Sequence, residues 1–383
     1  MDTGLCARVL LLLEPARLLC NWMLPAEAHP AASQGAMAAA AGSSADSKVV
    51  CVTGASGYVA SQLVAALLAK GCTVHGTVRS VANPAKTAHL KALPGAADRL
   101  KLFEADLLKA GSFDEALAGC SECHHTASPF FNDGVTDAEL QLIRPAVEGT
   151  LNVLGSCKKN GVRTIVVTSS TAAVYGRREG NPAGHVITEA QWADEDLAAE
   201  NKVHYVVSKI KAERAVWAFA EKEFPEARIV AVNPTLVVGP MLQPVMNTSS
   251  AVIAGFLSGE QTAVPSGYIT IVDVRDVVAA HIAAAEREAA SGRYLLVGGV
   301  AKWADLVASM REGTPSELAG KLPSEIADPA AEAPWRYNMK STLTVDCSKA
   351  TKDLGIEFRS PATSVRDLCA DSVFQSLVKP VTA

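Results

Sequence analysis

The chain has 383 residues, of which 49% are hydrophobic and 20% charged, and its formal net charge at pH 7 is −5. This length fits two or three domains, or one large α/β unit with an added lobe, and the composition is that of a folded globular protein. The mildly acidic balance gives no reason to expect nucleic acid or an anionic membrane surface as a partner. The nine cysteines are scattered and odd in number, which favours free thiols in a reducing compartment over a disulfide framework.

Residues 1–47 differ from the rest because they are rich in Ala, Ser and Pro. The apolar run at 9–13 is much shorter than the roughly 20 residues of a membrane span, and also shorter than the centre of a signal peptide. We expect a disordered extension, with a signal or transit peptide as the alternatives. Met37 is a plausible start of the functional chain. We therefore expect a cytoplasmic protein, with organellar targeting by residues 1–36 as the alternative.

The first legible unit is a strand, a glycine turn and a helix. The apolar run 49–52 leads into the turn, and the helix continues to Lys70. Glycines let the backbone approach a ligand closely, and the first N–H groups of the helix then face an anion. This order predicts a dinucleotide-binding turn. The residues expected to contact the cofactor there are Gly54, Ser56, Gly57, Tyr58 and Val59.

The next strand, predicted over 72–78, indicates which dinucleotide binds. It ends at Arg79, and no Asp or Glu occurs between Asp46 and Asp98. A site that prefers NAD needs an acid here for the ribose hydroxyl, whereas a guanidinium suits the 2′-phosphate of NADP. The pattern therefore predicts NADP, with the alternative that Arg79 is a solvated surface cation.

Asp106 follows a strand predicted over 100–105. At this position an Asp can either hold the adenine edge or cap the next segment, and both roles stay open from the residues alone.

The segment 118–129 contains the string Cys120-x-x-Cys123-His124, which has the spacing of a haem attachment site. Without a convincing secretory signal or a second ligand cluster, we expect neither haem nor metal. We expect a buried strand instead, and its end at 126–128 passes beside the cofactor.

Two later patterns carry catalytic side chains. A helix is predicted over 145–158, and the strand over 163–170 that follows it ends in hydroxyls at Ser169 and Ser170. In parallel sheets, ligands sit at the carboxyl ends of the strands. Tyr205 and Lys209 are four residues apart on a predicted helix, so they share one face. The pair is a weak motif alone and a strong one beside a hydroxyl-ended strand of a dinucleotide fold.

The remainder of the chain completes the fold prediction. Strands are expected at 228–232, 269–272 and 292–297, and helices at 274–286, 346–354 and from about 364. The βα alternation to about 235 predicts an α/β doubly wound parallel Rossmann sheet with a smaller α+β substrate lobe at the C-terminal side. The expected division is an NADP-binding domain over 48–235, to which 269–297 returns, and a mainly substrate-binding lobe over 236–383.

The motifs resemble the extended short-chain dehydrogenase/reductase superfamily, and within it the branch of dihydroflavonol 4-reductase, cinnamoyl-CoA reductase and related carbonyl reductases. The similarity runs from about residue 48 to 375. Five strings carry it: Val-Thr-Gly-Ala-Ser-Gly-Tyr at 52–58, His-Thr-Ala-Ser-Pro at 125–129, Val-Thr-Ser-Ser at 167–170, Tyr-x-x-x-Lys at 205–209 and Asn-Pro-Thr-Leu-Val-Val-Gly-Pro at 233–240.

The resemblance implies roles for individual residues. Ser170, Tyr205 and Lys209 would be the catalytic trio of an NADP-dependent oxidoreductase that acts on CH-OH groups. The expected cofactor contacts outside the glycine turn are Arg79 and Lys86 for the 2′-phosphate, Asp106 and Leu107 for the adenine, Thr126, Ala127 and Ser128 for the ribose region, Tyr205 and Lys209, and Pro234, Thr235, Leu236, Val237 and Ser249 beside the nicotinamide.

Three features bear on how close the resemblance is. Ala60 stands in place of the usual third glycine, which the fingerprint allows. The residues at 201–204 depart from the cinnamoyl-CoA reductase signature before Tyr205, which argues against a CoA-thioester substrate. Asn132 lies where the branch contacts substrate, although a loop Asn is more often a turn residue.

The implied reaction is hydride transfer from NADPH to a ketone or aldehyde of a small molecule, with Tyr205 as the proton donor. We expect the Lys209 ammonium to lower the pKa of Tyr205 from its ordinary value near 10, and Ser170 to bond the carbonyl oxygen. A 3β-hydroxysteroid dehydrogenase or a nucleotide-sugar epimerase would use the same trio, while a non-enzymatic NADP-binding protein would not need it. A monomer or homodimer is expected, and the specific substrate stays open.

Overall fold

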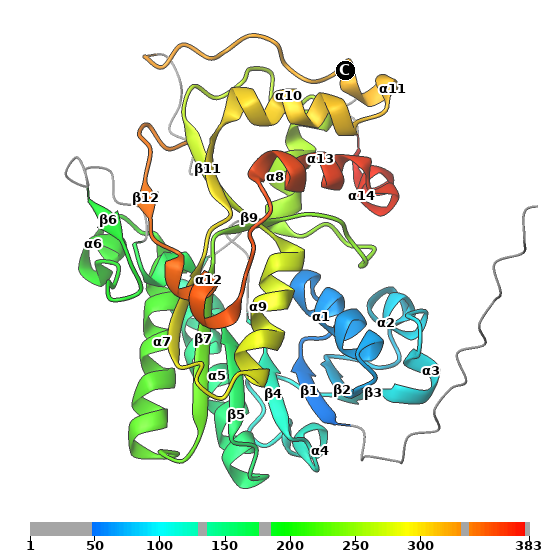
Figure 1. Ribbon diagram of the computed structural model, residues 1–383, viewed down its shortest axis with the longest axis vertical. Helices are drawn as coiled ribbons and strands as arrows, with labels where there is room; N and C mark the ends of the chain where they lie inside the picture. The colour runs from blue at the N-terminus through cyan, green and yellow to red at the C-terminus, as the bar shows by residue number, and fades with distance from the viewer. Residues whose placement is uncertain (1–47, 129–135, 176–184, 331–336, 380–383) are drawn as a thin grey trace, which may run out of the picture. The chain divides into compact units, whose positions relative to one another are not determined.

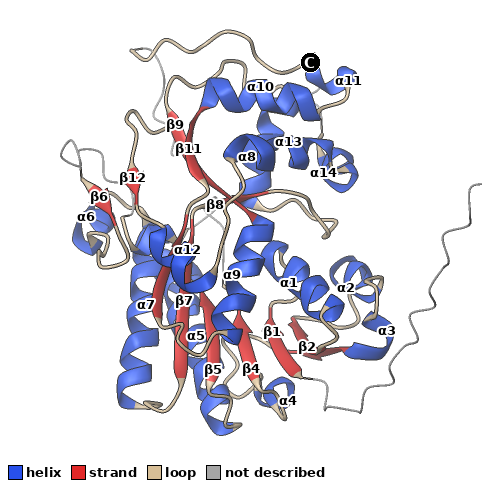
Figure 2. Cartoon of the chain, in the orientation of Figure 1, coloured by secondary structure: helices blue, strands red, loops and turns tan. Residues whose placement is uncertain are grey.

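The computed structural model describes residues 48–128, 136–175, 185–330 and 337–379. The expectations for residues 1–47 and for Asn132 concern positions outside these ranges. The largest element is a seven-stranded parallel sheet with the order β10-β7-β5-β4-β1-β2-β3 (Figures 1 and 2). The strand order reverses at β1, which lies between β2 and β4. The predicted doubly wound Rossmann sheet is therefore confirmed.

Most strands of this sheet follow apolar runs of the sequence, whereas β4 reads Glu-Cys-His-His. The strands are β1 (Val49–Thr53), β2 (Thr73–Val78), β3 (Leu100–Glu104), β4 (Glu122–His125), β5 (Thr164–Thr168), β7 (Arg228–Pro234) and β10 (Gly292–Leu296). Continuous apolar runs are typical of parallel strands, because helices cover both faces of such a sheet.

Alternate residues of β1 identify the two helical layers. Cys51 packs on one face with the helices α4 (Asp114–Leu117), α5 (Arg144–Lys159) and α7 (His204–Lys222). Val50 and Val52 pack on the other face against α1 (Tyr58–Ala69), together with Val278 of α9 (Val274–Glu286). The chain between β2 and β3 contains α2 (Pro84–Lys91) and α3 (Ala96–Arg99). In the described ranges, no helix has the length and apolarity needed to span a membrane.

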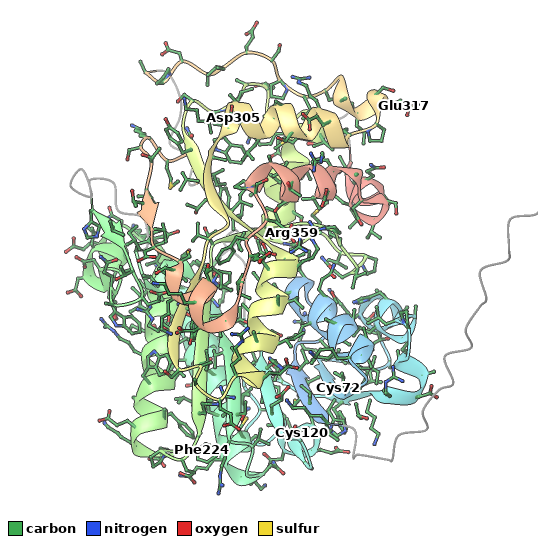
Figure 3. The ribbon with its side chains drawn as sticks, in the orientation of Figure 1. Cys72, Cys120, Phe224, Asp305, Glu317 and Arg359 are labelled. Carbon is green, nitrogen blue, oxygen red and sulfur yellow. The ribbon has the colours of Figure 1, made fainter. Side chains whose placement is uncertain are left out.

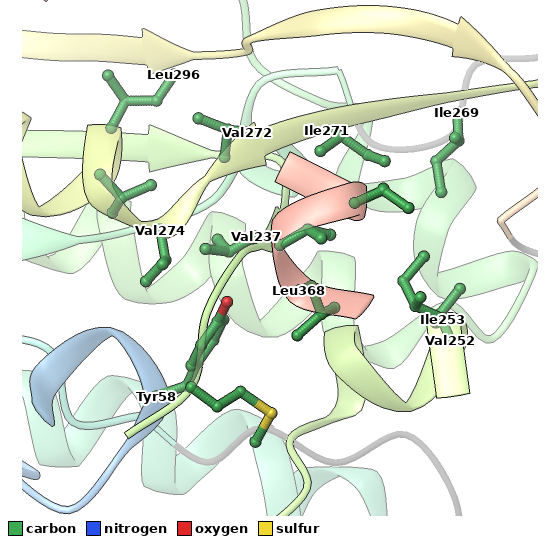
Figure 4. Packing of buried hydrophobic residues seen from close by; sticks show 14 of the residues in the cluster. Tyr58, Val237, Val252, Ile253, Ile269, Ile271, Val272, Val274, Leu296 and Leu368 are labelled. Carbon is green, nitrogen blue, oxygen red and sulfur yellow. The ribbon is translucent and has the colours of Figure 1, made fainter. Parts of the chain in front are cut away.

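A second, smaller sheet lies beyond the carboxyl end of β7. Its order is β11-β9-β8, with β8 (Leu236–Val238) parallel and β11 (Gly299–Lys302) antiparallel to β9 (Tyr268–Asp273). Figure 4 shows Ile271 and Val272 of β9 in one buried cluster with Leu368. β10, in contrast, rejoins the parallel sheet beside β7. The chain passes from one sheet to the other at about residue 235, and the domain boundary expected there stays a prediction. Within the segment 269–297, which was expected to return to the parallel sheet, β9 belongs to the smaller sheet and only β10 is a strand of the parallel one.

Three helices accompany the smaller sheet: α8 (Thr248–Ser258), α10 (Trp303–Gly313) and α13 (Pro361–Ala370). Trp303 stacks on Phe256 of α8 with ring centroids 5.1 Å apart. The other short elements are η1 (Glu139–Ile143), η2 (Thr171–Ala173), β6 (Val186–Ile187), α6 (Glu195–Glu200), α11 (Ser316–Ala319), β12 (Thr344–Val345), α12 (Ser348–Leu354) and α14 (Ser372–Leu377).

Ion pairs join α9 to the C-terminal segment. The Arg275 guanidinium donates to Asp273 over 2.8 Å and to Asp367 of α13 over 2.8 Å. Arg359, labelled in Figure 3, donates to the buried Asp276 through both its backbone and its side chain. Each buried carboxylate thus has a cationic partner, which a charge in the interior requires.

Several buried histidines lie on or beside the central strands. His281 of α9 lies 2.8 Å from the Thr168 hydroxyl and 3.4 Å from a ring nitrogen of His124, and His125 lies 2.9 Å from the Thr53 hydroxyl. Burial lowers the pKa of His125 to about 3. Burial, followed by the neighbouring histidines, also lowers the pKa of His281 well below its ordinary value. Both rings are therefore neutral in the folded protein.

We expect these neutral rings to make the fold sensitive to mild acid. Below pH about 6.5 the unfolded chain protonates both histidines while the folded chain does not, so the free energy of unfolding falls as the pH decreases from about 6.5 towards 3. The slope approaches about 1.4 kcal/mol per pH unit for each ring. Urea unfolding at pH 7.5, 6.0 and 5.0 measures this slope.

His281→Gln should reduce the slope, and His185→Gln is the matched control because His185 is exposed. A free energy of unfolding that stays constant from pH 7.5 to 5.0 would contradict the expectation.

Candidate active site

The glycine turn is shaped for close contact between backbone segments. Gly54 has φ +65°, and a Cβ there would lie 3.1 Å from the Cα of Ala127. The Thr53 hydroxyl accepts hydrogen bonds from the N–H groups of Thr126 and Ala127, at 3.1 and 3.0 Å. The ends of β1 and β4 are thus held together, so the turn and the segment 126–128 form one surface.

The start of α1 fits an anionic ligand. Gly57 occupies the N-cap and supplies no side-chain cap, so the first N–H groups of the helix are left without an intrahelical acceptor. This is the arrangement that binds a pyrophosphate. Ser56 and Val59 are partly exposed there. A dinucleotide therefore fits these residues through their backbone.

The side chain of Tyr58 is in a different environment from the other residues of the glycine turn. Its side chain is buried, and its hydroxyl donates to the carbonyl of Gly239 over 2.6 Å. Figure 4 shows the ring beside Val237 and Val274. Only the backbone of Tyr58 remains to face a ligand at the turn, and its side chain joins α1 to the segment after β8.

The residues predicted for the 2′-phosphate flank one loop. Arg79 is exposed directly after β2, and Lys86 lies on α2, a helix that the sequence did not predict. Asn83 caps this helix by accepting from the N–H of Ala85 over 3.1 Å. Glu104 orders the loop between them by accepting from the N–H of Val81 over 2.8 Å. The two cations are thus placed at the two ends of an ordered loop.

Asp106 adopts one of its two expected roles. Its carboxylate accepts from the N–H of Leu108 over 2.8 Å, so it caps a turn. Leu107 packs against α5, where a Cβ added at Gly149 would lie 2.8 Å from its side chain. The contact of Asp106 and Leu107 with adenine stays a prediction.

The three residues predicted to be catalytic lie close together. Ser170 follows β5 and accepts a capping hydrogen bond from the N–H of Ala172 over 3.1 Å. Tyr205 lies near the start of α7, and a hydrogen bond with the Ser170 side chain has a lowering effect on its pKa. The Lys209 ammonium lies 5.6 Å from the centre of the Tyr205 ring. It also donates to the Ser128 hydroxyl over 3.0 Å. The trio therefore adjoins the segment next to the glycine turn.

The pKa values differ from the sequence-based expectation. Burial raises the pKa of Tyr205, and the hydrogen bond from Ser170 opposes this only in part. Burial also lowers the pKa of Lys209 to about 8, against the opposing charge of Glu213. The expected lowering of the Tyr205 pKa is therefore not found, because desolvation disfavours both the phenolate and the ammonium.

The residues predicted beside the nicotinamide lie between the two sheets. The Thr235 hydroxyl bonds to Thr270 of β9, and the Val237 side chain belongs to the buried cluster of Figure 4. Pro234 ends β7, Leu236 begins β8, and Ser249 is buried in the first turn of α8, a helix that the sequence did not predict. Their contacts with a cofactor stay predictions.

The haem-like string is part of the sheet. Cys123 and His124 are consecutive on β4, so their side chains point to opposite faces. His124 bonds to Glu122 and His281, whereas Cys120 donates to the carbonyl of Ala116 over 3.2 Å. Among the described residues, no three His, Cys, Asp or Glu side chains are grouped as metal ligands. Cys120 and His124 are therefore hydrogen-bonded to other groups of the fold.

One buried group was missed by the sequence analysis. Glu213 follows Lys209 by four residues on α7 and pairs with Arg293 of β10 over 2.6 Å. Its position on the face shared by Tyr205 and Lys209 was a usable signal. Its partner, 80 positions away along the chain, was not predictable from spacing.

Comparisons with known proteins agree with this geometry. Residues 50–298 match the NAD dependent epimerase/dehydratase family. The chain is 43% identical over 320 residues to cinnamoyl-CoA reductase CAD2 of Medicago truncatula, covering 83% of this chain and 94% of that protein. It is 38% identical over 335 residues to tetraketide alpha-pyrone reductase 1 of Arabidopsis thaliana, covering 87% and 97%.

A solved structure is similar over the same region. Gre2 from Candida albicans, in complex with NADPH, has a TM-score of 0.72 and 33% sequence identity, covering 84% of this chain and 99% of that chain. The chain belongs to the NAD-dependent epimerase/dehydratase family, in the branch that contains the cinnamoyl-CoA reductases and related reductases.

Proposed function

We propose that this protein is an NADPH-dependent reductase that converts the ketone or aldehyde group of a small molecule into an alcohol. The observation that carries the proposal is the grouping of Ser170, Tyr205 and Lys209, with Lys209 bonded to Ser128 beside the glycine turn. A protein that only bound a dinucleotide would not need a phenol, an ammonium and a hydroxyl at one point.

The cofactor would be held by the glycine turn, by Arg79 and Lys86 at its phosphates, and by Lys209 at a ribose. When bound, it supplies the hydride. Arg79 favours NADPH over NADH, because a guanidinium binds a phosphate group through charge-assisted hydrogen bonds. The NADPH bound to the Candida Gre2 relative supports the same choice.

Two side chains of the protein would bind the carbonyl oxygen and donate a proton to it. The Ser170 hydroxyl bonds the carbonyl oxygen and stabilises the charge that develops on it. Tyr205 donates its proton to that oxygen as the alcohol forms. A phenol holds its proton at neutral pH. Burial, which raises the pKa of Tyr205, keeps it in this form until a strong base such as the alkoxide accepts the proton.

One local difference in sequence narrows the class of substrate. The residues at 201–204, directly before Tyr205, differ from the cinnamoyl-CoA reductase signature, which favours a ketone or aldehyde over a CoA thioester. The similarity to a cinnamoyl-CoA reductase makes the thioester the matched competitor. Purified protein with NADPH and a panel of aliphatic aldehydes, diketones, dihydroflavonols and cinnamoyl thioesters decides between them, with loss of NADPH absorbance as the signal.

Tyr205→Phe tests the proton donor. We expect kcat to fall by about 10²–10⁴-fold, the usual contribution of a general acid, while the Kd for NADPH measured by fluorescence changes little. Tyr294→Phe is the control, because the Tyr294 hydroxyl bonds to Asp353 over 3.2 Å within a different cluster. Near-normal turnover by Tyr205→Phe would remove this residue from the mechanism.

Arg79→Ala tests the cofactor choice. One charged hydrogen-bond partner contributes about 1.5–3 kcal/mol, so we expect the Kd for NADPH to rise by roughly 10–100-fold and the Kd for NADH to stay unchanged. Lys222→Ala removes an exposed cation at the far end of α7 and should change neither value. Equal weakening of both cofactors would show that Arg79 does not contact the 2′-phosphate.

A further inference from the structure

The buried carboxylate of Glu213 lies on the catalytic face of α7. Tyr205, Lys209 and Glu213 are spaced by four residues, so their side chains follow one another along the helix. The Glu213 side chain has no exposed surface, and its Oε1 accepts from Nε of Arg293 over 2.6 Å. A charge in this position needs a reason, because a buried ion pair seldom stabilises a fold more than apolar residues of the same size would.

Two further contacts of Glu213 lead to Ser170. Its Oε2 accepts from the Ser169 hydroxyl over 2.6 Å and from the Asn233 amide over 2.8 Å. The same Asn233 amide donates to the backbone carbonyl of Ser170 over 3.2 Å. The Glu213 carboxylate is therefore linked to the backbone carbonyl of Ser170 through Asn233, and to the preceding residue through the Ser169 hydroxyl.

Arg293 fixes the position of that carboxylate. Its Nη2 donates to the other carboxylate oxygen of Glu213 over 3.2 Å. Its Nη1 donates to the carbonyls of Glu189 and Gln191, at 2.9 and 2.5 Å. Its guanidinium also lies 4.0 Å from the centre of the Trp192 ring. Because the guanidinium is held by stacking and by the backbone, Glu213 has little freedom to move.

We propose that Glu213, held by Arg293, is a positioning residue for the reductase reaction: it fixes the end of β5 with Ser170 against the face of α7 that carries Tyr205 and Lys209. The inference rests on the proposed function. It also has an electrostatic part, because the negative charge of Glu213 opposes the effect of burial on the pKa of Lys209.

Glu213→Gln tests the inference because it keeps the shape and removes the charge. We expect kcat to fall by about 10–100-fold, the cost of losing one or two hydrogen bonds to a charged group, with KM for NADPH within about threefold. Without the carboxylate, the pKa of Lys209 falls further, so the alkaline limb of the kcat profile should move to lower pH. Glu195→Gln is the matched control, since it removes a 2.7 Å ion pair with Arg214 of the same helix.

A direct measurement separates this inference from the proposed function. The NMR titration of ¹³C-labelled Lys209, assigned with Lys209→Arg, should give a lower midpoint in Glu213→Gln than in the unchanged protein, whether or not a substrate is turned over. If the unchanged protein reduces no carbonyl, the proposed function fails while this titration still tests Glu213. A normal kcat, or an unshifted midpoint, in a folded Glu213→Gln would overturn the positioning role.

Ser169→Ala serves if Glu213→Gln does not fold. It removes one donor to Glu213 and leaves the ion pair with Arg293 in place. We expect a loss of about tenfold in kcat, the lower end of the cost of one hydrogen bond to a charged group, with the melting temperature nearly unchanged. A kcat equal to that of the unchanged protein would then refute the inference.

Discussion

The hydrogen bond from the Lys209 ammonium to the Ser128 hydroxyl is the contact on which the site depends. It joins α7, which carries Tyr205, to the end of β4, which adjoins the glycine turn. Lys209 is 7% exposed, and a buried charge must be paired or hydrogen-bonded. The need to satisfy this one group therefore brings the expected catalytic side chains and the expected cofactor surface together.

Strand ends supply the rest of the arrangement. In a parallel sheet all carboxyl ends lie at one edge, so β1, β4, β5 and β7 deliver the glycine turn, Ser128, Ser170 and Asn233 to the same region. Side-chain hydrogen bonds then set their spacing. The Thr53 hydroxyl holds β4 to β1, and Glu213 holds β5 and β7 to α7. The sheet brings these residues to the same region, and the polar contacts then fix their positions relative to one another.

Local patterns made most of the fold and the candidate trio predictable. Apolar runs ending in glycine or hydroxyl residues marked β1 and β5, and a four-residue spacing placed Tyr205 beside Lys209. Contacts between distant segments were not predictable. The sheet to which β9 belongs, the pairing of Glu213 with Arg293 and the burial of the Tyr58 side chain all depend on residues far along the chain. The helices α2 and α8 were missed because their sequences lack a strong periodic pattern.

Burial also explains why the expected lowering of the Tyr205 pKa was wrong: desolvation raises it instead. Spacing indicates which groups are neighbours, whereas desolvation depends on everything packed around them. In this site desolvation raises the pKa of Tyr205 and lowers that of Lys209 to about 8. A phenol with a raised pKa is a weak acid that stays protonated at neutral pH, and it gives up its proton only to a strong base. An alkoxide formed from a carbonyl would be such a base, so a buried Tyr205 can still serve as the proposed proton donor.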